Sequence, residues 1–207
     1  MLEGEPHSLT LSYTRMMMSF EAFLPHPREI ALIGLGGGSI AKWCHRNYPK
    51  ARFTAVEINP HVIAMGKVFG VPRASRRFRV MCEDGAKFVA NPPNSFDLLL
   101  IDCFTTDSLP PELCSQKFFD DCSNALAQSS LLVANLCWKK HARIIARIGK
   151  SFSGQVLVAR EPYGNTIVFA CKGKLLWSEK ENEASMSAKL KQFERKYKLG
   201  KALAPRG

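Results

Sequence analysis

The most informative part of the sequence is Glu29-Ile-Ala-Leu-Ile-Gly-Leu-Gly-Gly-Gly-Ser-Ile40, which is followed by Phe53-Thr-Ala-Val-Glu57. The first apolar run leads into a glycine cluster made of Gly34, Gly36, Gly37 and Gly38. A helical segment follows, and a second apolar run ends in a carboxylate 19 residues after Gly38. Glycines allow a tight turn and a close backbone approach to a ligand, while the acid can accept from both ribose hydroxyls. The order strand, glycines, helix, strand, acid predicts a nucleotide-binding βαβ unit.

The rest of the chain alternates apolar runs with helical patterns, which is typical of a doubly wound α/β sheet. We predict strands near residues 30–35, 52–57, 77–82, 96–102, 130–136, 154–160 and 166–172. We predict helices near residues 38–48, 60–68, 84–90, 115–127 and 138–149. The last two strands are joined by Glu161-Pro-Tyr-Gly-Asn165, whose composition predicts an antiparallel hairpin. Five parallel strands and a closing hairpin predict a class I methyltransferase-like Rossmann fold, with a mostly parallel seven-stranded sheet and helices on both faces.

Three segments are expected along the chain. Residues 1–29 are predicted to form an N-terminal extension and helix, and residues 30–173 the Rossmann-like nucleoside-binding domain. Residues 174–207 are predicted to form a basic amphipathic helix and tail. The apolar stripe of that helix is Met186, Leu190, Phe193 and Tyr197. This helix could dock on the domain, pair with another subunit or contact a polyanion, and docking is the default expectation.

Composition narrows the class of protein. The chain has 207 residues, 46% of them hydrophobic, and a formal net charge of +11. No apolar stretch approaches the roughly 20 residues that span a bilayer, and the N-terminus does not resemble a secretion signal. The seven cysteines form no C-x-x-C pair, so we predict reduced thiols in a cytoplasmic protein. The basic clusters could attract nucleic acid or form an inert surface, and a free polycation as substrate would need a locally acidic cleft.

Acids stand at the ends of three of the first four predicted strands, where ligands bind in such sheets. Glu57 would hold the ribose hydroxyls, and Ile58 could pack on a purine. Asp84, beside Gly85, could accept from an exocyclic adenine amine. Asp102 lies where the reacting centre of the ligand is expected, and a carboxylate there could orient an amine or remove its proton. Asp107 could bind a second ammonium or cap the turn before Pro110.

These motifs bring a family into view. The glycine loop, Val56-Glu57-Ile58-Asn59-Pro60, Glu83-Asp84-Gly85 and the loop from Asp102 to Pro110 resemble the spermidine synthase (polyamine aminopropyltransferase) family. Tyr13 and the methionine-rich segment after it fit the same resemblance, which covers about residues 9–172.

The resemblance implies a methyltransferase-like Rossmann domain and a homodimer. It implies transfer of an aminopropyl group from decarboxylated S-adenosylmethionine to putrescine or a related small amine. It assigns ribose to Glu57, adenine to Asp84 and activation of the amine to Asp102, with Tyr13 and Asp107 on the acceptor side.

Two positions depart from the family pattern. The family loop has the pattern Gly-Gly-Gly-Asp-Gly-Gly, whose acid pairs with the amino group of the aminopropyl donor, and Gly37 stands at that position here. The family sequence Asp-Ser-Ser-Asp-Pro is replaced by Asp102-Cys-Phe-Thr-Thr-Asp107, which puts two extra residues between the acids. These departures bear on which donor and which amine are bound.

Three hypotheses therefore remain. The first is a spermidine synthase-like transferase that uses decarboxylated S-adenosylmethionine. The second is an S-adenosylmethionine-dependent methyltransferase on the same fold, and the third is a catalytically silent nucleoside-binding relative. The five histidines form no metal-binding pattern, so no metal is expected.

Overall fold

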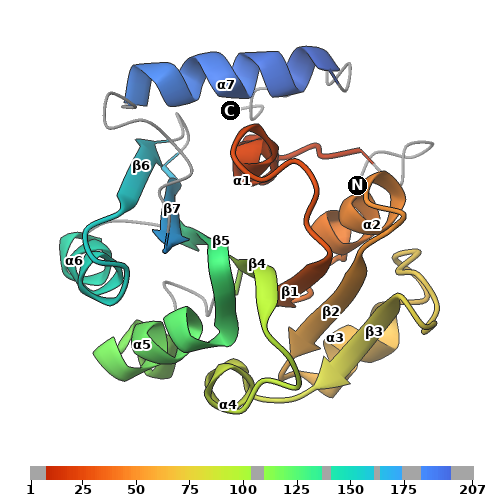
Figure 1. Cartoon of the computed structure of the whole chain (residues 1–207). Coiled ribbons are helices and arrows are strands. Elements are labelled where there is room, and N and C mark those ends of the chain that lie inside the picture. The colour runs from red at the N-terminus through yellow and green to blue at the C-terminus, as the bar shows by residue number, and fades with distance from the viewer. Residues whose placement is uncertain (1–7, 104–109, 137–140, 161–163, 174–182, 197–207) are drawn as a thin grey trace.

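The computed structural model describes residues 8–103, 110–136, 141–160, 164–173 and 183–196 (Figure 1). Its centre is a seven-stranded sheet in the order β3-β2-β1-β4-β5-β7-β6. The strands are β1 (Glu29–Ile33), β2 (Arg52–Glu57), β3 (Phe78–Cys82), β4 (Phe96–Ile101), β5 (Leu126–Leu136), β6 (Val156–Arg160) and β7 (Thr166–Lys172). The first five strands pair in parallel, so the order reverses between β1 and β4.

Helices cover both faces of this sheet, as predicted (Figure 1). One core contains side chains of α1 (Ser12–Met18), α2 (Ser39–Asn47) and α7 (Glu183–Lys196). The other core contains side chains of α4 (Gly85–Ala90), α5 (Gln116–Ala125) and α6 (Ala142–Ser151). The remaining short helices are α3 (Pro60–Met65), η1 (Ser19–Ala22) and η2 (Pro111–Cys114).

The sequence of β4 explains why the sheet is buried on both faces. Side chains alternate between the two faces of a strand, so a strand covered on both sides needs an unbroken apolar run. Leu98 and Leu100 pack into the core beneath α1 and α2, whereas Leu99 and Ile101 pack into the core beneath α4 and α5. All four side chains are fully buried. This strand fixes Asp102, the next residue, at the carboxyl edge of the sheet.

The predicted hairpin is confirmed. β6 and β7 pair antiparallel, and β7 also pairs antiparallel with β5, so β7 lies between them. This order completes the methyltransferase-like Rossmann arrangement. It also brings Asn165, just before β7, close to the carboxyl end of β5.

The boundary between α5 and β5 differs from the prediction. The helix ends at Ala125, and β5 starts at Leu126 rather than near residue 130. Leu126 pairs with Phe96 and Leu131 pairs with Leu98, so the β5 side carries a bulge. The bulge needs an unusual backbone, which Ser129 supplies at a φ of 56°. Such a bulge is set by tertiary pairing, so the helical pattern of the sequence misplaced the boundary.

The C-terminal helix α7 docks on the domain beside α1 (Figure 1). Phe193 is buried and its ring lies 5.5 Å from the ring of Trp43 in α2. Glu194 forms an ion pair of 3.0 Å with Arg15 in α1. No helix within the described ranges is long and apolar enough to cross a membrane.

Candidate functional site

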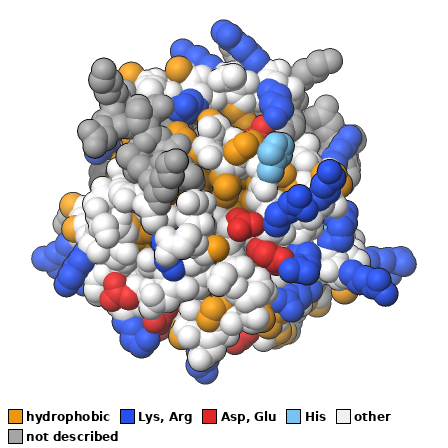
Figure 2. Space-filling model, viewed as in Figure 1, with side chains coloured by type: hydrophobic (Ala, Val, Ile, Leu, Met, Phe, Trp, Pro, Cys, Tyr) orange, Lys and Arg blue, Asp and Glu red, His pale blue; other side chains and the backbone are white. Residues whose placement is uncertain are grey.

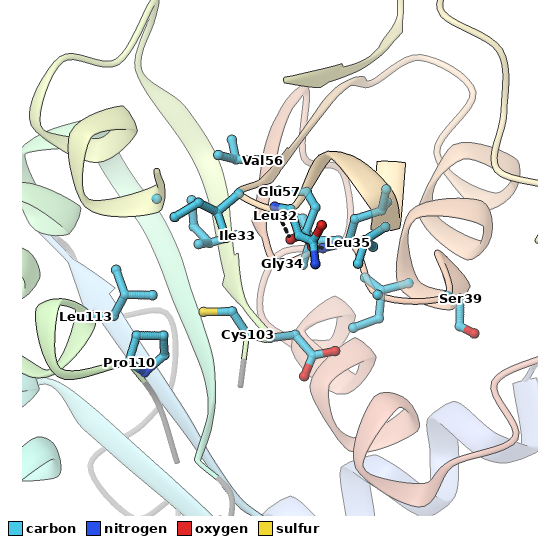
Figure 3. Close-up of a pocket in the computed structure, with 18 of the residues that line it drawn as sticks. Leu32, Ile33, Gly34, Leu35, Ser39, Val56, Glu57, Cys103, Pro110 and Leu113 are labelled. Atoms are coloured by element: carbon cyan, nitrogen blue, oxygen red, sulfur yellow. Dashed lines mark hydrogen bonds between the residues drawn. The ribbon is translucent and has the colours of Figure 1, made fainter. Parts of the chain in front are cut away.

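A pocket of about 1090 Å³ opens at the carboxyl edge of the sheet, where strand order reverses between β1 and β4. Its walls come from the glycine loop, the ends of β2 and β4, the start of α4 and the segment that leads into α1. In Figure 3, Glu57 and Leu35 lie at the glycine loop, and Pro110 and Leu113 form the opposite wall beyond Cys103. Ligands of doubly wound sheets bind at such a switch point, and this volume accommodates a nucleoside with a second substrate.

The pocket is acidic although the chain is strongly basic. The described residues that line it include five acids, Glu57, Glu83, Asp84, Asp102 and Glu112, and no Lys, Arg or His. Figure 2 shows acidic side chains near the centre of one face, with Lys and Arg around them. Against a net charge of +11, this concentration of acids creates a local field that attracts cations. The locally acidic cleft that a polycation substrate would need is therefore present.

The glycine loop is shaped by contacts that exclude larger residues. Gly34 has a φ of +94°, and a Cβ there would lie 2.3 Å from the backbone oxygen of Asp102. Its N–H donates to the carbonyl of Val56 at 2.8 Å, which joins the loop to β2. Gly36 and Gly37 line the pocket, and a Cβ at either position would meet no atom within 4 Å. The loop therefore closes tightly against the sheet and leaves open space on its ligand side.

Backbone N–H groups orient the Glu57 carboxylate. The N–H of Leu35 donates to Oε2 and the N–H of Asn59 donates to Oε1, each at 3.0 Å. One donor belongs to the glycine loop and the other to the turn after β2. Each carboxylate oxygen can accept a further bond, so two ribose hydroxyls could donate to the same group.

Asp84 caps α4 and faces the pocket. Its Oδ1 accepts from the N–H groups of Ala86 at 2.8 Å and Lys87 at 3.0 Å. Gly85 is required at the first position of the helix, because a Cβ there would lie 2.4 Å from Cγ2 of Ile33. Ile58 also lines the pocket and is 64% exposed, which leaves a large apolar side chain for a purine to cover.

Asp102 follows β4 and is held by side chains. Its Oδ1 accepts from Nδ2 of Asn135 at 2.9 Å, and its Oδ2 accepts from the hydroxyl of Tyr13 at 3.5 Å. Burial raises the pKa of Asp102 to about 6, although the hydrogen bonds from Asn135 and Tyr13 lower it. A carboxylate with this pKa is ionised at neutral pH and is a stronger base than an ordinary Asp.

The wall beside Tyr13 is fixed by a buried arginine. Arg15 is 4% exposed, and its guanidinium donates to the carbonyls of Leu9 and Thr10 and to Glu194 of α7. Thr10 and Leu11 line the pocket together with Tyr13. The C-terminal helix therefore helps to hold the N-terminal wall of the pocket in place.

The structure brings most of the predicted site residues to one pocket. Gly34, Gly36, Gly37, Glu57, Ile58, Asp84, Gly85, Asp102 and Tyr13 all line it. Gly38 instead caps α2 at a φ of +71° and faces Val71, so it supports the loop from behind. Asp107 lies outside the described residues.

Sequence reasoning missed Asn135 and Cys103. Asn135 is the polar residue of the run Leu131-Leu-Val-Ala-Asn-Leu136, at the carboxyl end of β5, and it is fully buried. A polar residue at that place in an apolar strand is a signal that the strand-end rule could have used. Cys103 lines the pocket beside Asp102, and burial, followed by the charge of Asp102, raises the pKa of its thiol. Among the described residues, no group of His, Cys, Asp and Glu side chains is arranged to hold a metal.

The sheet order, the acid at the end of β2 and the glycine loop define a Rossmann-like protein of the methyltransferase-like class. Residues 10–196 match the spermine/spermidine synthase domain family. The chain therefore belongs to the spermine/spermidine synthase family.

Several relatives carry the name polyamine aminopropyltransferase. The chain is 38% identical over 171 residues to one from Neisseria meningitidis serogroup B and 36% identical to one from Chromobacterium violaceum. These alignments cover 80% of this chain and 65% of each relative, so the chain spans less than two thirds of their length. A mouse eEF1A lysine and N-terminal methyltransferase is 25% identical over 142 residues, covering 64% of this chain and 20% of that protein.

Solved structures agree on the fold. Human methyltransferase-like protein 13, in complex with SAH, has a TM-score of 0.75 at 21% identity, covering 95% of this chain and 96% of that one. A spermidine synthase in complex with the transition state analogue AdoDATO has a TM-score of 0.67 at 21% identity, covering 91% of this chain and 76% of that one. Both show that the fold is shared with methyltransferases and with spermidine synthases.

Proposed function

We propose that this protein is an aminopropyltransferase that uses decarboxylated S-adenosylmethionine and a small amine. The observation that carries the proposal is the placement of Asp102, which stands in the pocket that holds Glu57 and Asp84. Membership of the spermine/spermidine synthase family and the polyamine aminopropyltransferase relatives support the same reaction.

The charge of the pocket supports the decarboxylated donor. A sulfonium nucleoside with an aminopropyl chain is a dication, and five acidic side chains line the described wall. An intact methionine chain would add a carboxylate, and no Lys or Arg in the described wall could pair with it. Placing an unpaired carboxylate among acids is unfavourable, so this pocket favours the ligand that lacks it.

The residues of the pocket suit transfer to an amine. Glu57 would hold the ribose, Asp84 the adenine amine and Ile58 the purine face. The amine nitrogen attacks the aminopropyl carbon next to sulfur, the C–S bond breaks, and its electrons remain on the thioether product. Asp102 takes the proton that the amine must lose to act as a nucleophile, and Tyr13 helps to orient the carboxylate.

One observation favours a second function, an S-adenosylmethionine-dependent methyltransferase. Gly37 lines the pocket where the resembling family has an acid, and open space surrounds the place of its missing Cβ. This loop therefore lacks the acid that pairs with the amino group of the decarboxylated donor in that family. The eEF1A methyltransferase relative is a member of this second class by name.

A ligand panel separates the two reactions. Decarboxylated S-adenosylmethionine and methylthioadenosine should raise the melting temperature more than S-adenosylmethionine and S-adenosylhomocysteine, since ligands that bind the folded state stabilise it. Incubation of the decarboxylated donor with putrescine should release methylthioadenosine. Turnover that requires S-adenosylmethionine and releases S-adenosylhomocysteine would establish the methyltransferase, and absence of any thermal shift would contradict both.

The substitution Gly37→Asp sharpens the test. A side chain fits at this position, and an added carboxylate would attract the ammonium of the decarboxylated donor and repel a methionine carboxylate. Preference for the decarboxylated donor should rise roughly tenfold, the value of one charge-assisted contact. Gly37→Asn has nearly the same size without the charge and should leave the preference unchanged.

The homodimer, the cytoplasmic location and the identity of the amine stay predictions. Binding of nucleic acid by the basic surface is less favoured, and salt-dependent retention of RNA would establish it.

A further inference from the structure

A chain of three side chains links the hairpin turn to Asp102. Nδ2 of Asn165, just before β7, donates to Oδ1 of Asn135 at 2.9 Å. Nδ2 of Asn135, on β5, donates in turn to Oδ1 of Asp102 at 2.9 Å. The three residues are far apart in sequence, and the pairing of β4, β5 and β7 brings them together.

We propose that Asn135 is a positioning residue for Asp102 and that Asn165 fixes the direction of the Asn135 amide. An amide side chain carries one carbonyl acceptor and one NH₂ donor. Because Asn165 donates to the carbonyl, the NH₂ of Asn135 must face Asp102. The carboxylate therefore always meets a donor from β5.

The direction of this amide decides how Asp102 behaves. An ionised carboxylate accepts hydrogen bonds, whereas a carbonyl facing it would require the protonated acid. Asn135 is fully buried, so an inverted amide would leave two acceptors facing each other away from water. The hydrogen bond that Asn165 donates to the Asn135 carbonyl opposes that arrangement, although Asn165 does not touch Asp102.

Other titratable groups surround Asp102. Substitution of Asn135 or Asn165 leaves all of them in place. Tyr13 of α1 donates to it, and Cys103 is next to it in sequence. Glu57 and Glu112 line other walls of the pocket. A change in the titration of Asp102 on altering Asn135 or Asn165 therefore reports on the hydrogen-bond chain.

The test is titration of the Asp102 carboxyl by carbon NMR in the full chain, with no ligand. Asn135→Leu has similar size and removes the donor, so the titration midpoint should rise by about 1–2 pH units. Asn165→Ala leaves Asn135 in place and should raise the midpoint by at least ~0.3 unit. The double substitution should match Asn135→Leu alone, because residues that act as a chain are not additive.

A matched control is Asn47→Ala, which removes an amide that donates to the carbonyl of Trp43 in α2. Its Asp102 midpoint should equal that of the unaltered protein. If Asn135→Leu does not fold, Asn165→Ala decides the matter alone. A lowered melting temperature with an unmoved midpoint in Asn165→Ala would overturn the proposal and reduce the chain to a structural role.

The consequence for turnover rests on the proposed function. The acidic limb of the rate profile should move to higher pH in the same order as the NMR midpoints. If no sulfonium nucleoside gives turnover but the midpoints move as expected, the hydrogen-bond chain stands and the proposed reaction fails. If the protein turns over the substrates but the variants shift neither the acidic limb of the pH–rate profile nor the NMR midpoint of Asp102, the proposed reaction stands and the positioning role of Asn135 fails.

Discussion

The proposed nucleoside half of the pocket, with Glu57 and Asp84, and the proposed amine half, with Asp102, hold their acids in different ways. Glu57 and Asp84 each accept two backbone N–H groups, from residues of the glycine loop, the adjacent turn and the first turn of α4. Asp102 instead accepts from two side chains, Tyr13 and Asn135, which lie 89 and 33 residues away in sequence. The first arrangement fixes the orientation of a carboxylate through the backbone, whereas the second surrounds Asp102 with side chains that lower its pKa against the effect of burial.

This difference matches the chemistry expected of each half. Ribose hydroxyls and an adenine amine need an acceptor that stays in place. Backbone N–H donors hold the carboxylate that serves as this acceptor. An amine nucleophile needs a group that takes up a proton, which burial supports by raising the pKa of Asp102 to about 6. If the two halves are separate, a substitution in one half should leave the other half unchanged.

The largest effect is expected for Asp102→Asn. Turnover should fall by about 10²–10⁴, the usual contribution of a general base, while methylthioadenosine affinity measured by calorimetry changes little. Asp121→Asn removes a half-buried acid of α5 that pairs with Lys117 outside the pocket, and it should leave both quantities unchanged. Surviving turnover in Asp102→Asn would show that the amine half needs no base here.

The same substitution should stabilise the fold. An Asp whose pKa is about 6 in the folded chain and about 3.9 in the unfolded chain binds protons more tightly when folded. Its ionised form therefore lowers the free energy of unfolding above pH ~6, and this penalty disappears as pH falls below ~4. Chemical denaturation at pH 8 should show a gain of roughly 1–3 kcal/mol for Asp102→Asn, and at pH 4 the gain should largely vanish.

The rate should depend on pH through the amine half alone. Turnover with saturating donor should fall about tenfold per pH unit below a midpoint near 6, because Asp102 must be ionised to accept a proton. Nucleoside affinity should stay flat over the same range. An affinity that falls together with the rate would mean that the two halves titrate as one site.

Glu57→Gln should damage the nucleoside half. The neutral amide loses charge-assisted bonds to ribose and to the N–H groups of Leu35 and Asn59, so nucleoside affinity should drop by about 10–100-fold. Glu29→Gln removes an acid that bonds Arg52 at the amino end of β1 and should not change affinity. If both variants lose the same amount of nucleoside affinity, Glu57 does not bind the ligand.

Asp84 allows capping to be separated from binding. Asp84→Asn retains a side-chain acceptor for the N–H groups of Ala86 and Lys87, so stability should hold while nucleoside affinity falls by a few fold. Asp84→Ala should lose the same affinity and, in addition, about 1 kcal/mol of unfolding free energy. Thermal melts without methylthioadenosine measure the stability, and melts with it measure the nucleoside affinity. If nucleoside affinity falls only in the variant that loses stability, Asp84 caps the helix and does not bind the ligand.

The smallest effect is expected for Tyr13→Phe. The hydroxyl lies 3.5 Å from Asp102, so its removal should lower turnover by about 2–5-fold and raise the midpoint of the pH profile slightly. Tyr48→Phe removes a hydroxyl that donates to Glu21 outside the pocket and serves as the control. If turnover falls as far in Tyr13→Phe as in Asp102→Asn, Tyr13 acts on the amine itself and does not merely orient the base.

Sequence patterns located the sheet because each strand has a simple local requirement. The run from Leu98 to Ile101 had to be central, since it is apolar on both faces. The start of β5 was misplaced because its bulge depends on pairing with β4, and a helical pattern runs through the boundary. The position of Asn135 at a strand end was visible in the sequence, but its hydrogen bonds to Asp102 and Asn165 form only when β4, β5 and β7 lie side by side.

The amino-acid sequence alone was enough to place the acids of the proposed nucleoside half. Gly34, Glu57 and Asp84 stand at strand and helix ends of one βαβ unit and the helix start after β3, so their spacing in the chain was enough to predict where they lie. Tertiary contacts set the surroundings of Asp102 and the docking of α7. Tyr13, Asn135 and Asn165 reach Asp102 only through strand pairing and helix packing, and Glu194 reaches Arg15 across 179 residues. The geometry of a turn or a helix start follows from nearby residues, whereas the environment of a half-buried acid such as Asp102 is set by every element that packs around it.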